Sequence, residues 1–158
     1  MDLPLVLWPK WYLLLIAYTA VLGVLALRHQ GVIATALKAQ ERSTADPRQR
    51  GELAGQRVAG WVRSIGWFVA AGLLLTGRSW AITVVAVAYA TSARRSYTAY
   101  AQGFAEGIKS VELAAAWEYV HGRVPLRPRD HAAALVYVSL TRLIPLGATL
   151  VALPWIGH

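Results

Sequence analysis

The sequence predicts an all-α membrane protein with four transmembrane helices, at about residues 5–27, 58–76, 80–96 and 132–155. Three observations predict this fold class. The 158 residues are 56% hydrophobic and only 15% charged, whereas soluble domains carry about 25% charged residues. The apolar residues gather into runs that approach the length needed to cross a bilayer. Basic residues flank these runs, as they do in membrane proteins.

The chain is short enough to form a single integral membrane domain, 1–158, with two cytoplasmic surface segments, 28–57 and 97–131. Its first span contains an unbroken apolar run over residues 11–27. A hydrocarbon core of ~30 Å requires about 20 helical residues, and residues 3–8 can extend the run outwards to that length.

The segment 28–57 is polar and predicts two short helices on the membrane surface, separated near Ser43 to Pro47. Asp46 followed by Pro47 is typical of a helix N-cap with proline at the first helical position. We expect the second surface helix to continue directly into the span at 58–76.

The second and third spans are joined by a tight turn at 77–79, and their uninterrupted apolar cores, 64–76 and 80–93, are short. Each covers roughly 20 Å at ~1.5 Å per residue, so the long side chains of Arg63, Arg94 and Arg95 must reach outwards to the interface. A re-entrant hairpin is the alternative. It would bury Arg78 in the membrane at a high cost, and two full crossings are preferred.

An amphipathic helix is predicted after the third span, because apolar residues recur there at steps of three and four. The residues expected to contact a partner or lipid in this region are Tyr97, Tyr100, Phe104, Ile108, Val111 and Trp117.

Arg142 lies near the centre of the last span, and Pro145 follows three residues later. A charge at this depth costs about 2.5 kcal/mol or more, and the four predicted spans contain no Asp or Glu. Carbonyl groups freed by Pro145, the hydroxyls of Ser139 and Thr141, or water can compensate part of the cost. Alternatively the helix is shifted and Arg142 reaches the interface. The functional hypothesis is that another molecule, such as a neighbouring subunit, supplies an acidic group or a lipid phosphate.

Charge predicts the orientation. If the N-terminus lies outside, 13 of the 16 basic residues fall on the cytoplasmic side, only Lys10 and Arg78 fall outside, and Arg142 lies within a span. The positive-inside rule favours this topology, with both termini outside. The net charge of +8 is then explained by the membrane, including anionic phospholipids, and we expect no nucleic-acid partner.

Small residues at helical spacing predict close helix packing, because small side chains allow backbones to approach in lipid. The residues expected to do so are Gly66, Ala70, Gly103 and Gly107.

No catalytic motif is present. The chain has no Cys, paired carboxylates and a P-loop are missing, and His29 and His131 are the only histidines placed to share a metal or haem iron. We expect neither metal nor cofactor, and no enzyme. The leading hypothesis is a non-catalytic structural, assembly or anchoring subunit of a larger complex in a bacterial inner (cytoplasmic) membrane, crossed several times. The alternatives are a self-assembling, holin-like pore or small transporter, and a haem or cofactor membrane anchor.

Overall fold

The computed structural model describes residues 9–105 and 125–156, and every regular element within these ranges is helical. The elements are α1 (Lys10–Ser43), α2 (Pro47–Leu75), α3 (Ser79–Ala105), α5 (Pro128–Val138), the π-helix η2 (Ser139–Leu143) and α6 (Ile144–Ile156). The last three follow one another without a break. Three helices are long and apolar enough to cross a membrane, namely α1, α2 and the continuous helix Pro128–Trp155. Their length and composition are those of a multi-pass membrane protein.

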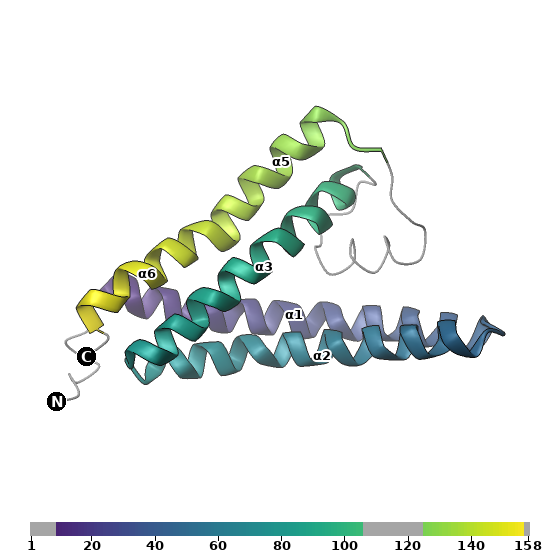
Figure 1. Cartoon of the computed structure of the whole chain (residues 1–158), viewed down its shortest axis with the longest axis horizontal. Coiled ribbons are helices and arrows are strands. Elements are labelled where there is room, and N and C mark those ends of the chain that lie inside the picture. The colour runs from purple at the N-terminus through teal and green to yellow at the C-terminus, as the bar shows by residue number, and fades with distance from the viewer. Residues whose placement is uncertain (1–8, 106–124, 157–158) are drawn as a thin grey trace.

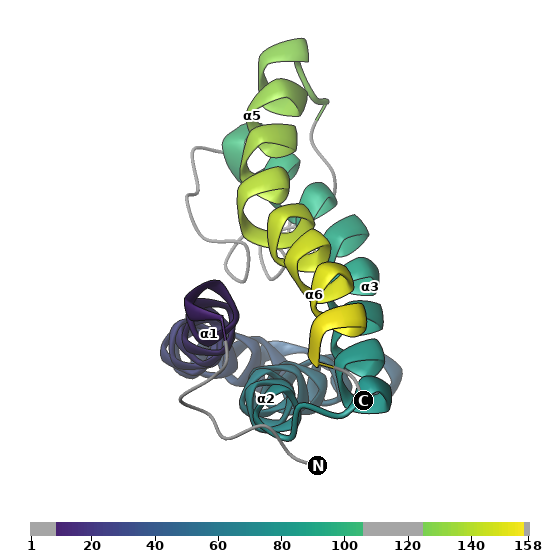
Figure 2. The ribbon, with the colours of Figure 1, turned by 90° about the vertical axis from the view of Figure 1, so that its left-hand side faces the viewer.

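Two helical hairpins make up the described chain (Figure 1). One pairs α1 with α2, and the other pairs α3 with the continuous helix α5–η2–α6. The hairpins meet at the end that holds the α2–α3 turn and the end of α6. They diverge towards the opposite end, where α1 is joined to α2 and where α5 begins (Figures 1 and 2).

The loop between α1 and α2 forms as the sequence predicts. Thr44 lies beyond the last turn of α1, and its N–H donates to the carbonyl of Gln40 over 3.0 Å. Asp46 then caps α2 by accepting from the N–H of Arg48 over 2.9 Å, with Pro47 at the first helical position. Arg50 donates through Nε to the carbonyl of Thr44 over 2.7 Å. Some of the orphan groups at both helix ends are therefore satisfied locally.

The prediction that two helices in 28–57 are separated near Ser43 to Pro47, with the second continuing into the next span, is confirmed. The prediction that the first of them is separate from the first span is wrong. Residues 28–43 continue α1, and residues 47–57 are the beginning of α2. No proline interrupts the chain between Leu27 and Ser43, so nothing ends the helix at the polar boundary. The extension also buries an apolar face of its own, since Ile33, Leu37 and Leu53 form a small core between the two helices. We call this paired extension, residues 28–57, the arm.

The turn between α2 and α3 occupies residues 76–78, and α3 begins at Ser79. Gly77 has a φ of 63°, the left-handed conformation that follows many helix ends and that only glycine adopts without strain. α3 then continues to Ala105, beyond the predicted boundary at residue 96, as expected from a stretch without proline. Because α3 is not among the three apolar helices, the described residues show three candidate membrane spans rather than the four predicted.

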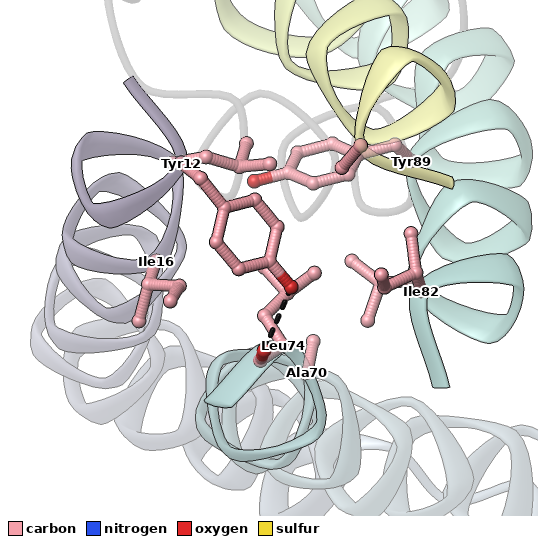
Figure 3. Close-up of a cluster of buried hydrophobic side chains, with 9 residues drawn as sticks. Tyr12, Ile16, Ala70, Leu74, Ile82 and Tyr89 are labelled. Atoms are coloured by element: carbon pink, nitrogen blue, oxygen red, sulfur yellow. Dashed lines mark hydrogen bonds between the residues drawn. The ribbon is translucent and has the colours of Figure 1, made fainter. Parts of the chain in front are cut away.

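The main core lies where the hairpins meet. It joins side chains from α1, α2, α3 and α6 (Figure 3), namely Tyr12, Leu15, Ile16, Ala70, Leu74, Ile82, Val85, Tyr89 and Ala152. Tyr12 donates its hydroxyl to the carbonyl of Leu74 over 2.7 Å. The hydroxyls of Thr19 and Tyr89 are 2.8 Å apart. Because Thr19 already donates to the carbonyl of Leu15, Tyr89 must be the donor to Thr19.

Large apolar side chains also cover the outside of the molecule. Each of the long helices exposes several of them, including Val24, Val69, Val87 and Leu140, which are all about half exposed or more. A soluble monomer rarely exposes apolar surface on this scale. This surface fits lipid or the apolar helices of a partner.

Candidate functional site

Arg142 lies in the middle of its membrane helix and is buried within the chain. It is the fifteenth of the 28 residues in the continuous helix Pro128–Trp155, and it is only 6% exposed. Other parts of the chain therefore cover its side chain.

Pro145 determines how Arg142 is held. Proline has no N–H, and its ring clashes with the carbonyl four residues earlier, which here belongs to Thr141. The helix widens to π geometry over Ser139–Leu143, and the N–H of Ile144 bonds to Ser139 instead. The freed Thr141 carbonyl accepts the Arg142 Nη1 over 2.9 Å and the Tyr18 hydroxyl over 3.1 Å. The expectation that a carbonyl freed by Pro145 helps to compensate Arg142 is confirmed.

Aromatic rings complete the surroundings. The Arg142 guanidinium carbon lies 5.2 Å from the centroid of the Trp67 ring, and the Trp67 and Tyr89 rings are 5.1 Å apart. We call Tyr18, Trp67, Tyr89, Thr141 and Arg142 the Arg142 cluster. It draws one residue from each of α1, α2 and α3 and two from η2, of which Thr141 contributes its backbone carbonyl, so it lies where both hairpins come together.

The contacts offset much of the cost of burying the charge, but leave one atom unsatisfied. A cation over an aromatic ring gains about 2 kcal/mol when desolvated, and a hydrogen bond to a charged group about 1.5–3 kcal/mol. The Nε atom of Arg142 is nevertheless buried without a hydrogen-bond partner among the described residues. Irregular π segments and unsatisfied buried groups both accumulate at functional sites, which makes the cluster the candidate site.

The carboxylates of the described residues lie elsewhere. Glu41 pairs with Arg57 at 2.8 Å, Glu52 with Arg48 at 3.5 Å, and Asp130 with Arg127 at 3.2 Å. All of these pairs lie in the arm or at the beginning of α5. An acidic group from another molecule thus stays a prediction for Arg142.

The apolar residues predicted to form one face of the amphipathic helix, here called the stripe, pack against their own chain where the structure describes them. The Tyr97 hydroxyl lies 2.6 Å from His131 Nδ1. The Tyr100 and Phe104 rings lie 5.4 Å and 5.1 Å from the ring of Tyr137. Ile108, Val111 and Trp117 lie outside the described residues. For the described part of the stripe, the observed neighbour is therefore α5.

The small residues expected to mediate helix packing differ in their surroundings. Ala70 is buried in the main core, and Gly103 is buried near the end of α3. A side chain added at Gly66 would meet no described atom within 4 Å, so close packing at Gly66 stays a prediction for contact with another molecule. Gly107 lies outside the described residues.

Sequence reasoning missed the glycines that α1 and α2 use against each other. A Cβ added at Gly23 would lie 2.8 Å from Phe68 Cε2, and one added at Gly60 would collide with the Gln30 side chain. Gln30 donates to the carbonyl of Arg57 over 3.2 Å. The signal was present in the sequence, because Gln30 falls seven residues after Gly23, on one face of a helix.

Sequence reasoning also missed Tyr18 and Trp67 as neighbours of Arg142. Both lie well inside apolar runs, away from the interfaces where aromatic residues with polar groups usually concentrate. That position was the available signal. Their placement inside apolar runs is explained by the contact of Trp67 with the Arg142 guanidinium and by the bond of Tyr18 to the Thr141 carbonyl.

The two histidines of the haem alternative lie on different hairpins. His29 belongs to α1 and His131 to α5, and these helices are not in contact. His131 Nδ1 is engaged by Tyr97. Within residues 9–105 and 125–156, no three His, Cys, Asp or Glu side chains gather as ligands of a metal ion would.

No family model matches the chain, and neither a curated protein nor a solved structure matches it.

Proposed function

We propose that this chain is a non-catalytic structural, assembly or anchoring subunit of a larger complex in a bacterial inner membrane. In this proposal it crosses the membrane four times, with both termini outside and the arm in the cytoplasm. Its partners are other membrane subunits, one of which supplies an acidic group to Arg142, and anionic phospholipids.

The distribution of charge along the hairpins supports the orientation. Lys10 and Arg78 lie at the end where the hairpins meet. Eleven basic residues lie in the arm, in the part of α2 next to it, in the second half of α3 and around the beginning of α5. They are the 13 expected on that side without Lys109 and Arg123, which lie outside the described residues. The eleven are Arg28, Lys38, Arg42, Arg48, Arg50, Arg57, Arg63, Arg94, Arg95, Arg127 and Arg129. Such asymmetry favours the basic end as cytoplasmic.

The arm is the observation that carries the proposal. Residues 28–43 extend α1 by about 24 Å at ~1.5 Å per residue, a large fraction of a ~30 Å hydrocarbon core. The arm is held together by the small core of Ile33, Leu37 and Leu53 and by the partly buried Arg57–Glu41 ion pair. A preformed basic hairpin beyond the membrane provides a surface on which a partner can assemble.

Arg142 supports assembly on energetic grounds. Replacing a buried charge by an apolar side chain is often neutral or stabilising, so stability alone does not account for an arginine at this depth. Its Nε is the atom left for an external acceptor. Because the side chain is covered, that acceptor must enter as the subunits pack together.

Extraction from the native membrane tests the proposal. After solubilisation in a gentle detergent, native mass spectrometry should find the 17.2 kDa chain in a heavier particle that contains other subunits. A strictly monomeric particle would overturn the proposal. A particle made only of this chain, whose expression depolarises the membrane, would favour the pore alternative instead.

A matched pair of variants tests the role of Arg142. Arg142→Leu should reduce the fraction of the chain that is found in the assembled particle. The isolated variant should unfold at the same concentration of denaturing detergent as the wild type, or at a higher one. Arg78→Leu removes the same charge from the exposed α2–α3 turn and should assemble normally. Full assembly of Arg142→Leu would show that the guanidinium has no intersubunit partner.

A further inference from the structure

A groove runs along the outside of α2 and α3. Its apolar part has a volume of about 360 Å³ and is lined only by aliphatic side chains and glycine, with Gly66, Ala70 and Ala88 as its small members. A polar part of about 450 Å³ continues along the same two helices and is lined by Arg63 of α2 and Arg95 of α3. The two parts adjoin at Val62 and Arg63, which are consecutive residues.

We infer that this groove binds one anionic phospholipid, with the headgroup phosphate between Arg63 and Arg95 and an acyl chain along the apolar part. The site itself requires only that α2 and α3 lie in a membrane. Its placement in the cytoplasmic leaflet rests on the proposed topology.

The length of the apolar part favours a lipid over a helix. From Arg63 to Leu73 the groove covers ten residues, or about 15 Å along α2. This is half of the ~30 Å hydrocarbon core, which is the depth that one leaflet contributes. A transmembrane helix from a partner would need a groove of the full depth.

The charges fit an anionic headgroup. Arg63 precedes the apolar core of α2, and Arg95 follows that of α3, so both lie at the same edge of the membrane. Glu52 also lines the polar part, but it pairs with Arg48 and lies about 16 Å along α2 from Arg63, eleven residues away. Two arginine side chains, one from α2 and one from α3, therefore line the end of the groove beside the apolar part.

Four variants of the full chain separate this site from general attraction to an anionic surface. Arg63→Gln with Arg95→Gln removes the headgroup contacts, and Arg42→Gln with Arg50→Gln removes the same charge from the tip of the arm without touching the pair of Arg48 and Glu52. Gly66→Leu fills the apolar part without changing charge. Gly72→Leu is its control, because a side chain added at either glycine meets no described atom within 4 Å.

The measurement is retention of phosphatidylglycerol, compared with phosphatidylcholine, by the purified chain in native mass spectrometry. We expect roughly 30-fold weaker phosphatidylglycerol binding for the Arg63 and Arg95 pair, since each arginine near an anionic surface contributes about a factor of five. Gly66→Leu should also weaken retention, whereas the tip pair and Gly72→Leu should bind as the wild type does.

Three results would overturn the inference. The first is an equal loss of binding in the two arginine pairs, and the second is full retention of phosphatidylglycerol by Gly66→Leu. The third is a crosslink from a photoreactive group at residue 66 to a polypeptide instead of a lipid. Retention of phosphatidylglycerol by the purified chain does not depend on whether the chain assembles with other subunits. A monomeric chain that retains the lipid at this groove would therefore overturn the proposed function and leave the lipid site standing.

Discussion

At the scale of single residues, the irregular helix backbone at Pro145 helps to stabilise the buried charge of Arg142. Without Pro145, the Thr141 carbonyl would bond within its helix and would be less accessible to Arg142 and Tyr18. With Pro145 in place, that carbonyl holds the guanidinium on one side and joins α1 on the other. The proline thus creates an acceptor at a depth where lipid provides none.

A double-mutant cycle tests this coupling. Tyr18→Phe removes the bond to Thr141 and should lower the unfolding free energy by about 0.6 kcal/mol, the average for such bonds between membrane helices. In the Pro145→Ala background, residue 145 regains an N–H that can bond Thr141, so the same Tyr18→Phe change should cost less. The measurement is reversible unfolding in mixed micelles. Equal costs in both backgrounds would mean that Pro145 does not free the acceptor.

At the scale of elements, the α1–α2 hairpin depends on glycine where the helices approach most closely. Gly23→Ala should lower the unfolding free energy by about 1–3 kcal/mol, as overpacking does, because the added Cβ would press on the Phe68 ring. Gly31→Ala, on the same helix, meets nothing within 4 Å and should be neutral or stabilising by about 0.5–1 kcal/mol. Mixed-micelle unfolding of both variants gives the comparison. If Gly23→Ala matched Gly31→Ala, the Phe68 ring would be free to swing into lipid.

The beginning of α5 gives a pH dependence. Asp130, in the first turn before the apolar run that begins at Ala132, accepts from the N–H of Arg127 over 3.0 Å and from its Nε over 3.2 Å. The backbone N–H and the nearby arginine side chains hold the pKa of this carboxyl below its ordinary value of 3.8. The folded state therefore binds the proton less readily than the unfolded chain does. The resulting stabilisation is complete above that ordinary value and is lost as the pH falls through the lowered folded pKa.

Amide hydrogen exchange in the first turn of α5 checks this expectation. In the wild type, protection should fall as the pH decreases below about 4, after correction for the intrinsic pH dependence of exchange. In Asp130→Asn the corrected protection should be lower at neutral pH and nearly independent of pH. An identical pH profile in the two proteins would assign the loss to another group.

The elements show which features of the fold are readable from sequence. Apolar runs located the helices, and Asp46 with Pro47 located the beginning of α2, because both signals are local. The arm was misassigned because polarity was taken as the end of a helix, whereas Ile33 and Leu37 find their apolar partner Leu53 only in three dimensions. The position of Arg142 was evident, but its ligands Tyr18 and Trp67 come from other helices, whose rotations about their axes no local pattern specifies.

At the scale of the whole molecule, the two hairpins lie together at one end and apart at the other (Figure 1). The main core and the Arg142 cluster join them. Beyond this region each hairpin is held by its own contacts, through Gln30 and Arg57 in one and Tyr97 and His131 in the other. A change in the Arg142 cluster is therefore placed to alter the angle between the hairpins and with it the position of the arm.

The topology of the whole chain depends on whether α3 crosses the membrane, and the chain lends itself to a direct test because it has no Cys. A single cysteine introduced by Ser43→Cys marks the tip of the arm, Ser79→Cys marks the α2–α3 turn, and Leu126→Cys marks the residues before α5. In right-side-out vesicles, a membrane-impermeant maleimide should label only the cysteine at residue 79 until the membrane is permeabilised. If α3 does not cross, the cysteines at residues 79 and 126 will be labelled from the same side. The four-crossing topology fails in that case, and with it the cytoplasmic placement of the basic ends of α3 and α5.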